Sequence, residues 1–201
     1  MPNTTDNFDI PFLDGTELVR DYPTFSEDLA NAVDNGLSNV GGGLVAVKDV
    51  LKTNAFVSGS ISAGQNVAVP GLSITHEVQD PANRLIISAF FGSAANSEGR
   101  GQTGIAIHDG TNLIGIADAA GSRTRVSAGG ITARTSAGQI VTMPSISFVH
   151  TPGAGSKTYT VRAINIREST QTLFVNRAQS DEDNASLHRA VSGIVIQEVA
   201  V

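Results

Sequence analysis

The sequence has no cysteine and no tryptophan, and only 5% of its 201 residues are aromatic. Without cysteine the chain has no disulfide framework, no thiolate metal site and no cysteine nucleophile. No stretch approaches the roughly 20 apolar residues of a membrane-spanning helix, and the N-terminus lacks the basic start and apolar run of a signal peptide. We therefore expect no membrane insertion and no secretory leader.

Charge is also scarce, and it is unevenly distributed. Residues 1–38 hold eight acidic side chains and one basic side chain, Arg20, whereas residues 39–201 hold 11 acidic and 12 basic side chains. The first segment is therefore strongly acidic and the remainder is nearly neutral. A protein that binds nucleic acid needs a basic stripe or arm, so we expect no nucleic-acid partner.

Residues 1–23 predict an extended segment. Pro2, Pro11 and Pro23 each remove a backbone donor and push the preceding residue toward extended geometry. A disordered tail is an alternative for such a terminus. The apolar side chains are spaced so that several can enter pockets on a neighbouring protein, and we interpret the segment as a docking arm whose contact residues are Phe8, Ile10, Phe12, Leu13 and Tyr22.

Residues 24–43 predict a short helix followed by a glycine hinge. Thr24 to Glu27 has the form of a capping box, in which the threonine hydroxyl and the glutamate carboxylate satisfy two free amides. Phe25, Leu29 and Val33 recur at helical spacing and form an apolar stripe that needs a packing partner. The glycines Gly41–Gly43 end this segment and provide the hinge.

Residues 44–201 change to short runs rich in β-branched residues, separated by turn clusters. The clearest hairpin has Asp109-Gly110 at its turn, between alternating apolar residues. The polar stretch 180–189 predicts either a loop or a helical turn. Short strands without interleaved helices favour a mainly β fold, an antiparallel β-sandwich of jelly-roll type. The residues expected to face inward are Ile86, Phe90, Ile105, Ile107, Ile114, Ile116, Phe148, Val161, Leu173, Val175 and Val195.

Residues suited to catalysis or metal binding are few and scattered. The four histidines, His76, His108, His150 and His188, lie far apart in the sequence without the spacing of a zinc motif. The acidic run 181–184 has oxygen ligands that suit calcium but lacks EF-hand spacing, so a solvated loop is the better interpretation. No nucleotide-binding loop or nucleophile elbow is present. The sequence predicts no catalytic residue, no cofactor site and no metal site.

Two segments carry a resemblance to a known family. Residues 9–23, DIPFLDGTELVRDYP, and residues 25–34, FSEDLANAVD, are similar to the N-termini of tail-fibre and minor tail proteins of small tailed bacteriophages. Residues 150–162, HTPGAGSKTYTVR, and residues 194–199, IVIQEV, resemble the last strands of jelly-roll modules in the same proteins. This chain has no room for a long shaft between the two segments, which favours a short tail component or a capsid decoration protein.

The resemblance implies a non-enzymatic virion structural protein that is assembled in the host cytoplasm. Its arm would dock on other virion proteins of the tail or capsid, and its body would form a homotrimer. Two alternatives remain open. A carbohydrate-binding module for a host-surface glycan would need a polar loop cluster bearing aromatic residues, which this sequence poorly supplies. An enzyme of unrecognised type would need His, Asp or Glu side chains that converge in a pocket.

Overall fold

The computed structural model describes residues 43–130, 140–183, 185 and 187–201, and the pairs 3–4, 11–12 and 30–31. The chain separates into two compact units, residues 1–43 with Val201, and Leu44–Ala200. In the first unit, β1 (Asn3–Thr4) pairs antiparallel with β2 (Pro11–Phe12), and Ala30 and Asn31 are helical. Of the predicted docking and helix-packing residues, only the backbone of Phe12 is described. Phe8, Ile10, Leu13, Tyr22, Phe25, Leu29 and Val33 lie outside the described residues.

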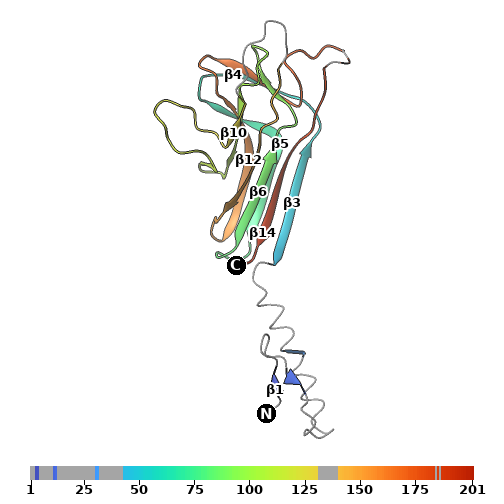
Figure 1. Ribbon diagram of the computed structural model, residues 1–201, viewed down its shortest axis with the longest axis vertical. Coiled ribbons are helices and arrows are strands. Elements are labelled where there is room, and N and C mark those ends of the chain that lie inside the picture. Colours follow the sequence, from blue (N-terminus) through green and yellow to red (C-terminus); the bar gives the residue numbers. More distant parts are fainter. Residues whose placement is uncertain are drawn as a thin grey trace. The chain divides into compact units, whose positions relative to one another are not determined.

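The second unit consists of antiparallel sheets, which confirms the predicted mainly β fold (Figure 1). A four-stranded sheet has the order β11-β6-β14-β3, and a second sheet has the order β10-β8-β12-β5 with β9 paired to β8. A third sheet has the order β4-β13-β7. The strands are β3 (Leu44–Lys52), β4 (Phe56–Ile61), β5 (Asn66–Val78), β6 (Arg84–Phe90), β7 (Ala94–Asn96), β8 (Thr103–His108), β9 (Leu113–Ile114), β10 (Ala128–Gly129), β11 (Ser145–His150), β12 (Gly155–Asn165), β13 (Gln171–Val175) and β14 (Ser192–Val199).

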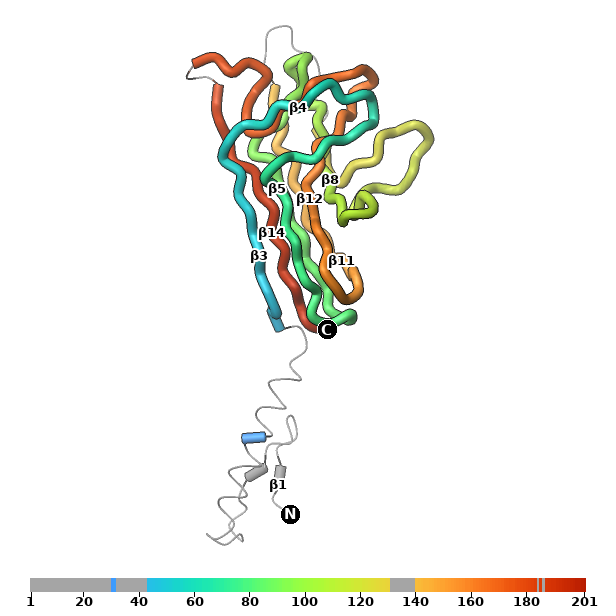
Figure 2. Tube along the Cα trace, turned by 180° about the vertical axis from the view of Figure 1, so that it is seen from behind, coloured from blue at the N-terminus to red at the C-terminus, as the bar shows by residue number. Residues whose placement is uncertain are grey.

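One hydrophobic core joins the three sheets. Strands β3 and β14 of the four-stranded sheet contact β5 of the second sheet, and Figure 2 shows β5, β12 and β8 side by side. The four-stranded sheet supplies Leu85, Ile87, Ile194 and Ile196, and the second sheet supplies Leu72, Ile74, Ile105, Ile107, Tyr159 and Val161. Leu173 and Val175 of β13 complete the cluster.

The inward-facing predictions are confirmed on five strands, β8, β9, β11, β12 and β13, and wrong on two. Ile105, Ile107, Val161, Leu173 and Val175 are all fully buried, and the half-buried Ile114 and Phe148 pack against the core. On β6 and β14 the expected face is displaced by one residue, because a strand sends successive side chains to opposite faces. Phe90 is exposed, Ile86 and Val195 are half-buried, and the buried positions are Leu85, Ile87, Ala89, Ile194 and Ile196. Ile116, which follows β9, is half-buried.

The longest strand, β5, passes through a Pro70-Gly71 pair that reads as a turn in the sequence. Gly71 has a positive φ of 82°, and the register with β12 shifts between Thr160 and Arg162. A bulge of this kind leaves extra residues unpaired and lets the strand continue in a new direction. The predicted strand at residues 66–69 therefore covers only the first part of β5, and β3, β4, β7 and β10 were not among the predicted strands.

The hairpin at Asp109-Gly110 is confirmed as the β8–β9 pair, with His108 opposite Leu113. Asp109 Oδ1 accepts hydrogen bonds from the backbone amides of Thr111 and Asn112 at 2.9 and 2.8 Å. Gly110 has a positive φ of 96°, which suits glycine. The described residues of the stretch 180–189 form neither helix nor strand, which favours the loop of the two predicted alternatives.

Asn176 connects the end of β13 to two other segments. It is fully buried and has a positive φ of 64°. Its Nδ2 donates to the backbone oxygens of Lys52 at 2.7 Å and Asn54 at 3.2 Å, and its Oδ1 accepts a hydrogen bond from Ser192 Oγ. Asparagine adopts the left-handed region more readily than other residues that bear a Cβ atom. This one side chain therefore satisfies backbone carbonyls at the end of β3 and in the loop after it, and it holds the start of β14.

Replacing Asn176 with alanine should lower the free energy of unfolding by about 3 kcal/mol, because buried carbonyls lose their donors and alanine disfavours a positive φ. Urea denaturation measures the change. Asn176→Gly removes the same hydrogen bonds but accepts the backbone conformation, so it should be less destabilising than Asn176→Ala. Equal losses for the two variants would contradict the contribution of the backbone conformation.

Candidate functional site: the outer face of the four-stranded sheet

The face of the sheet β11-β6-β14-β3 that points away from the core is rich in apolar side chains. Cross-strand partners share a face, and the register places Val149, Ile86, Gln197 and Val47 in one row. The next row contains Ser147, Ser88, Val195 and Asp49, and the row after it contains Ser145, Phe90, Gly193 and Leu51. We call this surface, including Arg84, Val199 and Leu44 at its end, the outer face.

Several of these apolar side chains are open to solvent. Leu51 is 62% exposed, Val149 60% and Val47 49%. Isolated exposed apolar residues are ordinary, but a contiguous apolar surface marks an interaction site. Figure 1 shows β6, β14 and β3 running side by side, so the outer face is continuous across three of its four strands.

Gly193 brings two apolar side chains together in the last row of the outer face, on the inner strand β14. A Cβ atom at this position would lie 2.9 Å from the ring of Phe90 and 3.0 Å from Leu51 Cδ2. Both side chains therefore cover the bare backbone of Gly193. This packing explains why Phe90 points outward, against the sequence prediction, and still keeps only 37% of its surface exposed.

The outer face carries little charge. Along the register its charged positions are Asp49 on β3 and Arg84 on β6, which have opposite signs. The neighbouring Lys48 shares the other face with Ile196, and its Nζ donates to the backbone oxygen of Thr75 on β5 at 2.9 Å. The sequence did contain a signal for this surface, since Leu44 to Leu51 is an apolar run interrupted only by Lys48 and Asp49.

A buried polar cluster links β5 to β14 on the core side. Glu198 is fully buried, and its carboxylate accepts from Asn83 Nδ2 at 2.7 Å and from the backbone amide of Gln79 at 2.9 Å. His76 Nε2 lies 2.7 Å from Glu198 Oε2. Burial raises the pKa of Glu198, but the hydrogen bonds from Asn83, Gln79 and His76 outweigh it and hold the pKa below its usual range. The Glu198 carboxylate is therefore satisfied from within the fold, whereas His76 Nδ1 is buried without a hydrogen-bond partner among the described residues.

The structure places the four histidines on four different segments. His76 lies in the core beside Glu198, His150 ends β11, His108 ends β8, and His188 is exposed in the loop before β14. His150 packs edge-on against Tyr159, with ring centroids 6.0 Å apart. Burial lowers the pKa of His150, and burial, together with the charge of Asp109, raises the pKa of Tyr159 to about 12.

The described acidic residues of the run 181–184 are engaged or exposed. Asp181 forms ion pairs with Arg177 and Arg189, and Glu182 and Asp183 are exposed on the same loop. Asn184 lies outside the described residues. Throughout the described part of the chain, no three His, Asp or Glu side chains come close enough to hold a metal ion.

The described residues include no helix with the length and hydrophobicity needed to cross a membrane. Comparison of the sequence with protein-family models gave no match, and a search of curated proteins gave none. The interpretation of the outer face therefore depends on its own geometry and chemistry.

Replacing Glu198 with glutamine should destabilise the protein at neutral pH by about 1–3 kcal/mol, because buried donors lose a charged acceptor. The effect should shrink on acidification. A depressed carboxyl pKa stabilises the fold above the unfolded-state pKa, and this stabilisation is lost as the pH falls through the folded-state pKa. Urea denaturation between pH 7 and pH 3 measures the destabilisation and its decrease on acidification. Glu77→Gln, an exposed position on β5, is the control; a pH-independent difference for Glu198→Gln would contradict the prediction.

Proposed function

We propose that the protein is a structural component of a bacteriophage virion, of the short tail or capsid-surface type. Its body would be a jelly-roll-like β-sandwich that forms a homotrimer through the outer face, and its N-terminal segment would attach it to other virion proteins. The observation that supports assembly is the apolar, nearly uncharged outer face. The resemblance of residues 9–34 to tail-protein N-termini supports the virion assignment.

The sandwich arrangement is supported by contacts between the two larger sheets. Lys48 on β3 reaches the Thr75 carbonyl on β5, and Glu198 on β14 meets His76 on β5. Apolar side chains from both sheets contribute to one core. Two sheets that bury one face each against the other form the layered architecture of a sandwich.

A second copy of this chain is the occupant that fits the outer face best. Around the three-fold axis of a homotrimer the same residues of the three copies lie close together, so a strongly charged patch there would repel itself. Asp49 and Arg84 have opposite signs, and the remaining positions of the outer face are apolar, serine, glutamine or glycine. Homo-oligomer interfaces are also more apolar than other protein surfaces. These properties favour self-association.

The first unit would serve as the attachment device. Its residues 1–38 hold eight acidic side chains and one basic side chain, so a basic receiving surface would attract it. Extended segments that become ordered on binding bury a large surface for their length. The separate clustering of residues 1–43 and Leu44–Ala200 supports an independent body.

Replacing Val47 with lysine should weaken self-association about tenfold or more, because a charge in the apolar interface costs more than about 1.4 kcal/mol for each contact. Sedimentation velocity over a concentration series measures the association. Val57→Lys is a matched control, since Val57 on β4 is 47% exposed and Val47 on β3 is 49% exposed. A wild-type protein that stays monomeric at micromolar concentration, or equal effects of the two variants, would refute assembly through the outer face.

Deleting residues 1–38 should leave the body folded and oligomeric but abolish its incorporation into particles. Circular dichroism and sedimentation test the folding and assembly of the body, and particle assembly in the presence of the truncated protein tests incorporation. Attachment of the intact protein to a basic surface should also weaken with added salt, because exposed charges are screened within about 10 Å at 0.1 M ionic strength. Normal incorporation of the truncated protein would refute the attachment role.

A further inference from the structure

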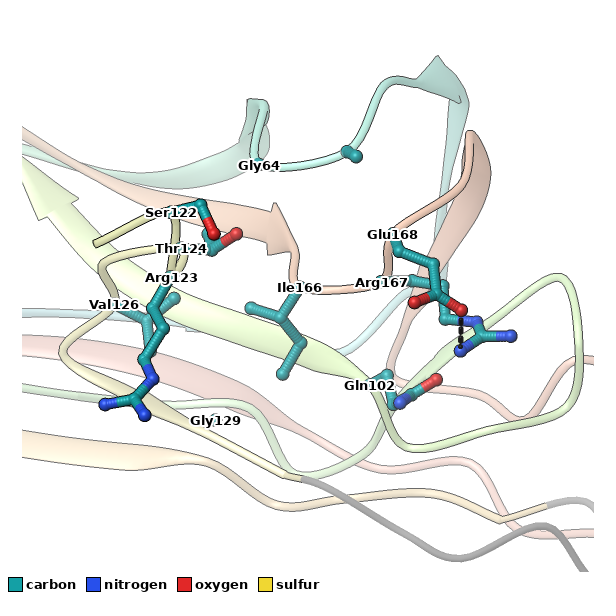
Figure 3. Close-up of a pocket in the computed structure, with 11 residues that line it drawn as sticks. Gly64, Gln102, Ser122, Arg123, Thr124, Val126, Gly129, Ile166, Arg167 and Glu168 are labelled. Atoms are coloured by element: carbon teal, nitrogen blue, oxygen red, sulfur yellow. Dashed lines mark ion pairs between the residues drawn. The ribbon is translucent and has the colours of Figure 1, made fainter. Parts of the chain in front are cut away.

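A pocket of about 690 Å³ lies among four segments that are distant in the sequence. They are the β4–β5 turn, the residue before β8, the long segment between β9 and β10, and the β12–β13 loop. Figure 3 shows Ile166 between two polar groups, with Ser122 and Thr124 on one side and Gln102, Arg167 and Glu168 on the other. The volume falls in the usual range of small-molecule sites, about 300–1,000 Å³.

Asn165 holds two walls of the pocket together through hydrogen bonds of its side chain and of its backbone. Asn165 is fully buried, and its Nδ2 donates to the backbone oxygens of Ile61 and Ser169, both at 2.8 Å. Its backbone oxygen accepts from Gly64 N, and its backbone nitrogen donates to Gln65 O, both at 2.9 Å. These bonds tie the β12–β13 loop to the β4–β5 turn, so two walls of the pocket are fixed without a ligand.

The apolar part of the pocket rests on glycines. A Cβ atom on Gly104 would lie 2.6 Å from Val126 Cγ1, and a Cβ atom on Gly129 would lie 3.2 Å from Ile166 Cδ1. Val126 and Ile166 therefore sit directly on the backbone of β8 and β10. They form an aliphatic surface between the polar groups.

Arg167 is neutralised within the wall. Its Nη1 lies 2.9 Å from Glu168 Oε1, and its Nε lies 3.4 Å from Glu98 Oε2. Glu98 is further held by Arg100 Nε at 3.2 Å and by Gln171 Nε2 at 3.0 Å. Burial raises the pKa of Glu98, but the charges of Arg167 and Arg100 and the hydrogen bond from Gln171 outweigh this effect and hold the pKa below its usual range. This wall contributes fixed donors and acceptors but little net charge.

Two groups of the pocket lack partners in the described part of the chain. Gln102 Oε1 is closed off from solvent and accepts no hydrogen bond from the described residues, so a ligand that turns this half-buried side chain toward the pocket can satisfy it with an O–H or N–H donor. Arg123 is exposed, and its guanidinium has no acidic partner among the described residues. Arg123 therefore favours a ligand that also carries an anionic group.

From these groups we infer that the pocket binds a carboxylate-bearing saccharide. Sugar hydroxyls both donate and accept, which suits Gln102, Ser122, Thr124 and Glu168 together, and the C–H face of a sugar ring suits Ile166 and Val126. A carboxylate on the sugar pairs with Arg123. Inorganic phosphate offers mainly acceptors, so it supplies few donors to Gln102 Oε1 and to the hydroxyl oxygens of Ser122 and Thr124.

The test is binding of the full chain to an array of oligogalacturonates, oligoglucuronates and sialosides, with neutral galactose and glucose oligomers as their counterparts. We expect binding to at least one carboxylated saccharide and about tenfold weaker binding to its neutral counterpart. Binding to none of the carboxylated saccharides, or equal binding to the neutral ones, would overturn the inference.

Two variants assign the binding to this pocket. Arg123→Ala should weaken binding of the carboxylated saccharide about tenfold and leave any binding of neutral saccharides unchanged, because it removes only the charge pair. Arg189→Ala, an exposed arginine in the β13–β14 loop, should bind like the wild type, and circular dichroism checks that both variants are folded. Wild-type binding by Arg123→Ala would place the saccharide elsewhere and refute the assignment. The readout does not require particle assembly, so it is separate from the tests of the outer face.

Discussion

The apolar side chains on both faces of the four-stranded sheet are the constraint from which most of the structure follows. β6 contains Leu85-Ile86-Ile87, and β14 contains Ile194-Val195-Ile196. Since a strand sends successive side chains to opposite faces, such runs place apolar groups on both sides of the sheet. The core covers one side with β5, β12 and β8. The other side is the outer face, and a second copy of the chain would remove it from water.

The same constraint decides how far the sequence could predict the fold. On β8, Ile105 and Ile107 alternate with the smaller Gly104 and Ala106, and the large residues were correctly predicted to face the core. On β6 and β14 every position near the centre is apolar or small, so a period of two does not distinguish the faces. The inward residues there could be identified only from what packs against them. Phe90 illustrates this, because its place depends on the missing side chain of Gly193, which belongs to a different strand.

The roles of the buried polar residues Glu198 and Asn176 could not be predicted from the sequence for a different reason. Glu198 meets His76 across 122 positions of the chain, and Asn176 meets Lys52 across 124 positions. In the sequence each is an ordinary polar residue near a strand, and its role comes entirely from distant partners. The pocket is similar, since Gln102, Arg123 and Ile166 belong to separate segments. The stretch Ala120-Gly121-Ser122 has the small residues and the glycine that are typical of a turn, but its proximity to Gln102 cannot be seen in the sequence.

The outer face and the pocket lie on different parts of the fold. The outer face belongs to the β11-β6-β14-β3 sheet, whereas Val126, Gly129 and Ile166 of the pocket adjoin β10 and β12 of the other large sheet. Association through the outer face would therefore leave the pocket residues free. Open polar pockets without aromatic side chains bind single saccharides weakly. Three pockets on one trimer would act together on a repetitive glycan, and linked sites gain about 10²–10⁴ in avidity without any new contact. Assembly into a trimer would thus convert weak binding by a single pocket into tight binding to a polysaccharide.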